Sequence, residues 1–328
     1  MSWETLYGHE KPKAILRAAL EQERIAHAYL FYGMAGIGKR SVALNFAKAL
    51  NCTRRRELLD ACDSCISCRK ADHRNHPDIE IIEAQGQFIH KAAVDELQER
   101  IKFRPSEGSR CVFIIDEADR LRTEAANALL KTLEEPPPAA LLILVTARPH
   151  QLPATVLSRC QQVSFTPLPR ETVARFLVER LALGSEEADV IAAAAGGSIA
   201  HALATNRDDF LALRAQVMAA MAGGWRGKPG NLLALLSSLH GYKREVPECL
   251  AVLRSCFSDA LRWRETRERV GLTNGDRMDL VEALAARLTG RELLACLETI
   301  DAAGRALDAN ANRALTLEWM AFKLAAVW

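Results

Sequence analysis

A glycine-rich loop between a short apolar segment and a helical pattern constrains this chain most strongly. The segment 28–32 is apolar, Gly-Met-Ala-Gly-Ile-Gly-Lys follows at 33–39, and apolar residues recur at helical spacing from Lys39 onward. Strand, glycine loop and helix occur in this order in a P-loop, where backbone N–H groups surround phosphate oxygens. The pattern predicts a nucleotide phosphate site formed by Gly33, Gly36, Gly38, Lys39, Arg40 and Ser41.

Position 40 departs from the usual form of this loop. The residue after the loop lysine is ordinarily Ser or Thr, whose hydroxyl binds Mg²⁺, but here it is Arg40. A guanidinium has no lone pair for a cation, and Ser41 is rotated by roughly 100° around the helix. We expect the loop to suit ATP or ADP, with magnesium-dependent hydrolysis weak or absent. A tight strand–helix turn without a ligand is the alternative.

Further apolar runs indicate the fold class. A strand-like segment at 78–82 and apolar runs at 111–115 and 140–146 alternate with helical patterns at 90–102 and 120–134. Continuous apolar runs separated by helices are typical of a parallel sheet buried on both faces. The sequence predicts an α/β P-loop domain over 1–166. Pro167 and Pro169 mark its end, and only helical periodicity follows, in a small domain over 167–206 and an all-α domain over 207–328.

Four of the nine cysteines are clustered in a segment that is poor in large apolar residues. Their spacing is C-x9-C-x2-C-x2-C, and two C-x2-C links suit a tetrahedral metal site. An odd cysteine count in a chain without a visible secretory leader argues against a disulfide framework. We predict a structural zinc ion, with an iron–sulfur cluster as the less favoured alternative. The predicted ligands are Cys52, Cys62, Cys65 and Cys68.

Composition excludes some classes of function. The net charge is +2, so any contact with DNA has to come from a local patch. No apolar run approaches the ~18 residues that cross a bilayer, and the N-terminal residues lack the pattern of a signal peptide. We therefore expect a cytoplasmic protein without a membrane partner.

Two carboxylates follow the apolar run 111–115, Asp116 and Glu117. In P-loop ATPases the Asp of such a pair holds magnesium and the Glu polarises the attacking water. We assign Asp116 to the nucleotide site and Glu117 as a candidate catalytic residue. The alternative is that the pair only complements a helix N-terminus.

Three longer motifs carry a family resemblance. Asp-Glu-Ala-Asp-Arg-Leu begins at Asp116, Asn-Ala-Leu-Leu-Lys-Thr-Leu-Glu-Glu-Pro-Pro spans 127–137, and Ser-Arg-Cys spans 158–160. Together they resemble the clamp-loader branch of the AAA+ ATPases, most densely over 25–165. The resemblance implies an AAA+ domain with a zinc module at 52–68, a helical lid domain and an oligomerising collar domain. It also implies that Arg159 is an arginine finger, catalytic in trans on the ATP of a neighbouring subunit.

Departures from the family pattern favour its stator-like, delta-prime type of subunit. Arg40 replaces the magnesium ligand, Ala200 stands where the motor type has a nucleotide-sensing arginine, and the chain stops at Trp328 without a longer extension. This resemblance implies a hetero-pentamer with gamma/tau and delta subunits, which loads the sliding clamp on primed DNA. The chain would then be a subunit of a DNA-directed DNA polymerase holoenzyme that does not itself polymerise and is weak or inactive as an ATPase.

Two other functions stay open at this point. An ATP-hydrolysing gamma-type motor is favoured by the intact Asp116–Glu117 pair. A zinc-bearing AAA+-like adaptor outside the clamp loader is the third hypothesis. The first nucleotide sensor is also open between Thr146 and Ala147.

Overall fold

The computed structural model describes residues 2–204, 207–222, 230–238, 245–269, 271–309 and 311–327. It divides into two compact units, Met1–Ala182 with Gly196–His201, and Leu183–Ala195 with Ala202–Trp328. The division into three domains at 166/167 and 206/207 stays a prediction, and its second boundary adjoins residues 205–206, which lie outside the described residues.

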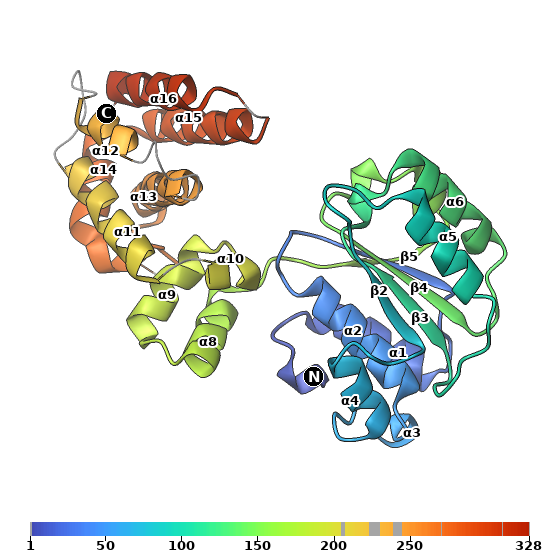
Figure 1. The fold of residues 1–328 in the computed structure, drawn as a ribbon. Helices are drawn as coiled ribbons and strands as arrows, with labels where there is room; N and C mark the ends of the chain where they lie inside the picture. Colours follow the sequence, from blue (N-terminus) through green and yellow to red (C-terminus); the bar gives the residue numbers. More distant parts are fainter. Residues whose placement is uncertain are drawn as a thin grey trace. The chain divides into compact units, whose positions relative to one another are not determined.

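A parallel five-stranded sheet forms the centre of the first unit (Figure 1). The strand order is β2-β3-β4-β1-β5 and every neighbouring pair is parallel. The α/β class with a parallel sheet is therefore confirmed. The strands are β1 (Ala28–Tyr32), β2 (Ile79–Ile82), β3 (Cys111–Ile115), β4 (Ala140–Thr146) and β5 (Gln161–Ser164).

Helices cover both faces of the sheet. Successive strand residues point to opposite faces, so Tyr29 and Phe31 of β1 pack in one core cluster and Leu30 packs in the other. Phe46 of α2 joins the first cluster, and Leu129 of α6 joins the second. The helices of the two faces are α1 (Glu10–Glu21) and α2 (Lys39–Asn51) on one side, and α5 (Lys91–Arg100) and α6 (Thr123–Glu134) on the other (Figure 1).

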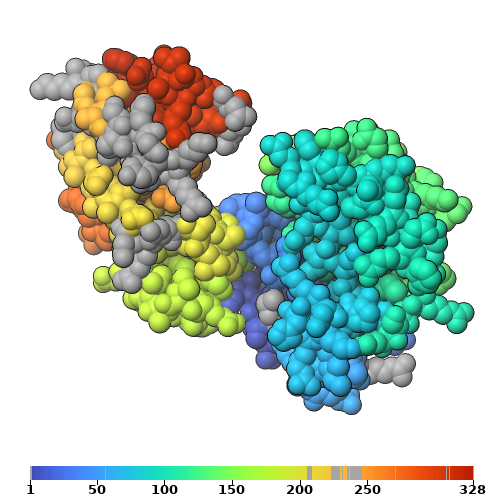
Figure 2. Space-filling model, viewed as in Figure 1, coloured from blue at the N-terminus to red at the C-terminus, as the bar shows by residue number. Residues whose placement is uncertain are grey.

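Several short helices and the 12-residue α8 complete the first unit. The segment of residues 60–80, light blue in Figure 2, forms a continuous part of the surface in that view. The remaining elements up to the unit boundary are η1 (Trp3–Thr5), α3 (Arg55–Leu58), α4 (Ile66–Asp72), η2 (Ala118–Arg120), η3 (Pro149–Gln151), α7 (Ala154–Leu157) and α8 (Arg170–Leu181).

The second unit is helical in its described residues. Its longest helix, α13, packs against α9, α11, α14 and α15, and α16 packs against α15 and α12. Among the described residues, no helix combines the length and the hydropathy needed to cross a bilayer. The helices are α9 (Ser185–Ala194), α10 (Ile199–Ala204, which spans the division), α11 (Arg207–Ala222), α12 (Gly230–Ser238), α13 (Glu245–Thr266), η5 (Gly275–Arg277), α14 (Met278–Arg287), α15 (Gly290–Asp308) and α16 (Arg313–Val327).

Candidate functional site

The loop between β1 and α2 has the backbone that a phosphate cradle needs. Gly33, Gly36 and Gly38 have φ angles of 145°, 73° and 103°, a region that glycine enters without steric cost. A methyl group on Gly33 would lie 2.2 Å from the carbonyl oxygen of Phe165. One on Gly36 would lie 2.3 Å from Ser198 Oγ. Close approach as well as conformation therefore requires glycine at both positions.

Lys39 spans the loop from the first turn of α2. Its Nζ donates hydrogen bonds to the carbonyl oxygens of Gly33 and Met34, at 2.7 Å and 2.6 Å. The side chain is buried, and this burial lowers its pKa, while Asp116 and Asp119 oppose the shift. An ammonium has three N–H donors, so one stays available for a phosphate oxygen.

Arg40 lies against the acidic residue of the expected magnesium site. Its Nη1 donates a hydrogen bond to Asp116 Oδ2 at 3.0 Å, and its Nη2 forms an ion pair with Glu83. Asp116 follows β3, and Glu83 follows the neighbouring strand β2. A fixed positive charge therefore contacts the carboxylate that in related loops faces a metal ion.

Glu83 and Thr146 belong to this edge of the sheet. The sequence offers Thr146 as one of two candidates for the first nucleotide sensor, but it does not indicate Glu83 as a site residue. The carboxyl ends of parallel strands form ligand sites, and both residues lie at such ends. Thr146 Oγ1 donates to Asp119 at 2.6 Å. Glu83 could have been flagged as a carboxylate that follows an expected strand, but its contact with Arg40 depends on β2 lying beside β3.

Two predicted residues are less directly engaged. Glu117 has a φ of 50° and pairs with Arg120 at 3.2 Å, with about half of its side chain exposed. Ser41 is half-buried one position further along α2. The structure thus brings the three loop glycines, Lys39, Arg40 and Asp116 together, while Glu117 contacts a neighbour on its own turn.

The start of α10, with Ser198 just before it, lies against the phosphate loop. The Ala200 amide donates to the carbonyl oxygen of Gly36 at 3.0 Å, and the methyl group of Ala200 is among the atoms that enclose Gly36. The position that the resemblance assigns to a nucleotide-sensing arginine is therefore beside the loop, and here it offers no charge.

Arg159 lies elsewhere on the same unit, between α7 and β5. Its Nη1 donates to the carbonyl oxygen of Thr155 at 2.9 Å, and its Nη2 lies 2.8 Å from Glu134 Oε1. Glu134 is the last residue of α6, which covers the sheet face opposite α2. The side chains of Arg159 and Glu134 are 36% and 51% exposed, so a neighbouring protein can reach the guanidinium.

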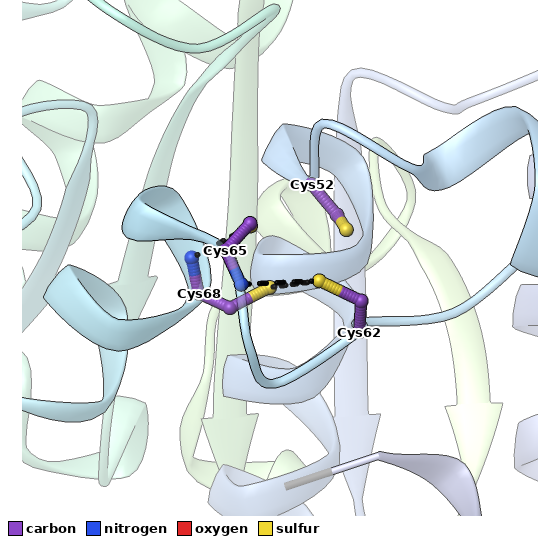
Figure 3. A group of neighbouring side chains, drawn as sticks. All are labelled: Cys52, Cys62, Cys65 and Cys68. Atoms are coloured by element: carbon purple, nitrogen blue, oxygen red, sulfur yellow. Dashed lines mark hydrogen bonds between the residues drawn. The ribbon is translucent and has the colours of Figure 1, made fainter.

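The four clustered cysteines converge as the spacing predicts (Figure 3). Their sulfur atoms all lie within 4.8 Å of one another, and the Sγ atoms of Cys62 and Cys68 are 4.0 Å apart. Four thiolates around zinc at about 2.3 Å place the sulfur atoms about 3.8 Å apart. The cluster Cys52, Cys62, Cys65 and Cys68 therefore fits a tetrahedral metal ion, and a zinc ion held there would keep no open coordination position.

Backbone amides and a buried lysine support this cluster. The amides of Cys65 and Cys68 donate to the sulfurs of Cys62 and Cys65, at 3.3 Å and 3.4 Å, which favours thiolates. Lys48 of α2 is fully buried and contacts Asp63 at 2.6 Å and Asp72 at 2.7 Å. Burial opposes the charge of Lys48, but the two carboxylates outweigh it and raise its pKa. The cysteine module is therefore anchored to α2.

The other five cysteines are buried, as expected for packing residues. Burial raises the pKa of Cys160, Cys249, Cys256 and Cys296 to about 12, so these thiols are neutral and unreactive at pH 7. The fifth, Cys111, is buried in β3.

Family models and relatives of known identity match most of this chain. Residues 8–169 match the family model described as "DNA polymerase III, delta subunit", and residues 208–325 match "DNA polymerase III, delta subunit, C terminal". The delta' subunit of Pseudomonas aeruginosa is 32% identical over 307 residues, which cover 89% of this chain and 90% of that protein. The delta' and tau subunits of Bacillus subtilis are 35% and 36% identical over 62% and 61% of this chain. These two alignments cover 61% and 36% of the Bacillus proteins, less than two thirds of each.

The parallel sheet, the phosphate loop and the carboxylates at the strand ends define a P-loop protein of the AAA+ class. Within that class, both family models and the relative that matches nearly end to end point to one branch. The chain belongs to the family of bacterial DNA polymerase III delta-prime subunits, which are clamp-loader proteins.

Proposed function

We propose that this chain is the stator-like subunit of a replicative clamp loader and supplies Arg159 to the ATP site of a neighbouring motor subunit. The observation that carries the proposal is the contrast between two arginines. Arg159 is partly exposed and held at the surface by Glu134, whereas Arg40 is engaged with the acidic residue of the chain's own phosphate loop. A trans arginine stabilises the charge that develops on the γ-phosphate.

The partners follow from the same proposal. Gamma/tau and delta subunits would complete a hetero-pentamer through the helical region that begins near residue 207, and the complex would load the sliding clamp on primed DNA. The polymerising chemistry belongs to another subunit of the holoenzyme. A cytoplasmic location follows from membership in this replication family.

Each predicted site residue has a place in this proposal. Gly33, Gly36, Gly38 and Lys39 would hold the phosphates of ATP or ADP, with Ser41, Arg40 and Asp116 next to them. Glu117 pairs with Arg120 and would contribute little to hydrolysis in cis. Cys52, Cys62, Cys65 and Cys68 would hold a structural zinc ion.

A gamma-type motor is the second candidate. The similarity to the Bacillus subtilis tau subunit and the retained Asp116–Glu117 pair favour it. Arg40 on Asp116 and the methyl side chain at position 200 oppose it, because a motor needs both a magnesium site and a nucleotide sensor.

Reconstitution separates these candidates. The chain is mixed with gamma/tau and delta subunits of the same organism, and the complex is followed by size-exclusion chromatography and light scattering. A stator forms a stoichiometric complex and has background ATP turnover when measured alone with Mg²⁺. Turnover by the isolated chain at the rate of a gamma subunit would establish the motor instead. Failure to enter a complex would remove the stator function.

A further inference from the structure

Arg40 is held between two carboxylates at one edge of the sheet. Its Nη1 is 3.0 Å from Asp116 Oδ2, and its Nη2 pairs with Glu83. The side chains of Arg40 and Asp116 are 30% and 18% exposed. The contact therefore lies in a partly dehydrated site, where an ion pair is more persistent than one in open solvent.

This guanidinium and a magnesium ion compete for the same position. In a P-loop the hydroxyl of the residue after the lysine binds Mg²⁺, and the strand-end Asp completes the coordination shell. Arg40 begins at that residue and ends on that Asp, Asp116. Since two cations on one carboxylate repel each other, a metal ion cannot take its usual place while Arg40 remains there.

The same guanidinium still has donors for a ligand. Arginine carries five N–H donors in a planar fork that suits phosphate oxygens. The contacts of Arg40 with the two carboxylates, through Nη1 and Nη2, need only two of these five N–H groups. Lys39 also retains one N–H beyond its two bonds to the loop carbonyls. Two adjacent fixed cations therefore offer unused donors beside the glycine loop.

We propose that Arg40 replaces Mg²⁺ at this site, so that the loop binds a diphosphate group without a metal ion. The proposal rests on the nucleotide pocket assigned above but does not depend on Arg159. It gives the retained loop a binding role that does not depend on hydrolysis. The charge that Mg²⁺ ordinarily supplies is built into the chain, and the bound diphosphate is not activated for transfer.

Isothermal titration with ADP and with inorganic pyrophosphate tests this proposal on the full chain. Each probe is titrated in excess EDTA and again in Mg²⁺. The wild-type Kd should agree within about twofold between the two conditions. Arg40→Ser restores a hydroxyl and releases Asp116, so its affinity in EDTA should fall by about tenfold or more and recover with Mg²⁺. Comparison of the two probes shows whether a nucleotide or free diphosphate is the source of the group.

Arg74→Ser provides the matched control. Arg74 also pairs with Glu83, at 3.6 Å, but its side chain is 62% exposed. This change removes a charge near the same carboxylate and should leave binding in EDTA unchanged. Arg40→Lys keeps the positive charge at position 40 and should retain binding in EDTA. This variant therefore distinguishes the loss of the charge from a folding defect in Arg40→Ser.

Three results would overturn the proposal. The first is that neither probe binds to the wild-type chain in EDTA. The second is that Mg²⁺ raises the wild-type affinity by about tenfold or more. The third is that Arg40→Ser and Arg74→Ser lose equal affinity in EDTA. None of these bears on a trans function of Arg159, which is measured on the ATP of the neighbouring subunit.

Discussion

Arg159 Nη2 lies 2.8 Å from Glu134 Oε1, and both side chains are partly exposed. Glu134 ends α6, and Arg159 follows α7, so the ion pair joins two helices on one face of the sheet. An exposed pair of this kind contributes about 0–1 kcal/mol to stability. The guanidinium can therefore leave Glu134 for a phosphate at small cost.

The first prediction concerns this pair in the isolated chain. Glu134→Gln and Arg159→Ala should each change the free energy of unfolding by less than about 1 kcal/mol, because both side chains are solvated. Urea unfolding followed by circular dichroism measures the change. A loss above about 2 kcal/mol in either variant would show that Arg159 has a structural function that surface ion pairs do not have.

The second prediction concerns the cysteine cluster. The purified chain should contain one zinc ion, and Cys65→Ser should lose it and unfold at a lower temperature, because metal binding contributes directly to the folding of such modules. Inductively coupled plasma mass spectrometry and thermal unfolding provide the two readouts.

Cys160→Ser is the control for that change. Cys160 is buried in the sheet core and is distant in sequence from the cluster, so the variant should keep its zinc whatever it loses in stability. An iron–sulfur absorption band in the wild-type chain would contradict the zinc assignment. Retention of zinc by Cys65→Ser would contradict the assignment of Cys65 as a ligand.

The third prediction uses Asp78, which organises the loop before β3. Its carboxylate accepts hydrogen bonds from the amides of Ser106, Glu107 and Gly108 at 2.6 to 2.8 Å. Burial opposes ionisation, but these three bonds outweigh it and lower the pKa of Asp78. Because the pKa of Asp78 is lower in the folded state, its ionised carboxylate stabilises the fold at pH values above the unfolded-state pKa of about 3.9. This stabilisation is lost as the pH falls through the lower pKa of the folded state.

Asp78→Asn should therefore destabilise the chain at pH 7 by about 1–3 kcal/mol. The difference between wild type and variant should shrink as the pH falls from 6 toward 2. Guanidinium titrations across this range measure it. A difference that stays constant with pH would show that Asp78 stabilises the loop through packing and not through its charge.

The fourth prediction compares two glycines with positive φ. Gly33→Ala should abolish the phosphate loop geometry and cost more than about 2 kcal/mol, because the new methyl group meets the Phe165 carbonyl oxygen at 2.2 Å. Gly86 has a φ of 73° and nothing within 4 Å of an added Cβ, so Gly86→Ala should cost only about 1 kcal/mol of backbone strain. Equal costs in thermal or urea unfolding would contradict the close approach at Gly33.

The main strands of the first unit are predictable because the apolar character of their own residues indicates them. β1, β3 and β4 are continuous apolar runs, and their observed bounds agree with the expected 28–32, 111–115 and 140–146. The sequence of β5 carries no such apolar run. Only Val163 of its four residues is buried, because β5 lies at the sheet edge and gains its place by backbone pairing with β1.

The candidate site was predictable to a similar extent. The spacing alone predicts that the four cysteine side chains come together, since short C-x2-C links allow few arrangements of the sulfur atoms. The partner of Arg40 was not predictable, because its contacts with Asp116 and Glu83 depend on how long side chains from three elements meet. The sequence indicates that a magnesium ligand is missing, but not that a guanidinium reaches the magnesium-binding carboxylate.

The central claim is that this chain contributes to hydrolysis through Arg159 and not through its own loop. Phosphate release by the reconstituted complex, with sliding clamp and primed DNA, tests it most directly when wild type, Arg159→Ala, Lys39→Ala and Glu134→Gln are compared. We predict that Arg159→Ala lowers clamp-dependent turnover by about tenfold or more, while Lys39→Ala and Glu134→Gln stay within about twofold of wild type. A loss in Lys39→Ala as large as that in Arg159→Ala, or no loss in Arg159→Ala, would contradict the claim.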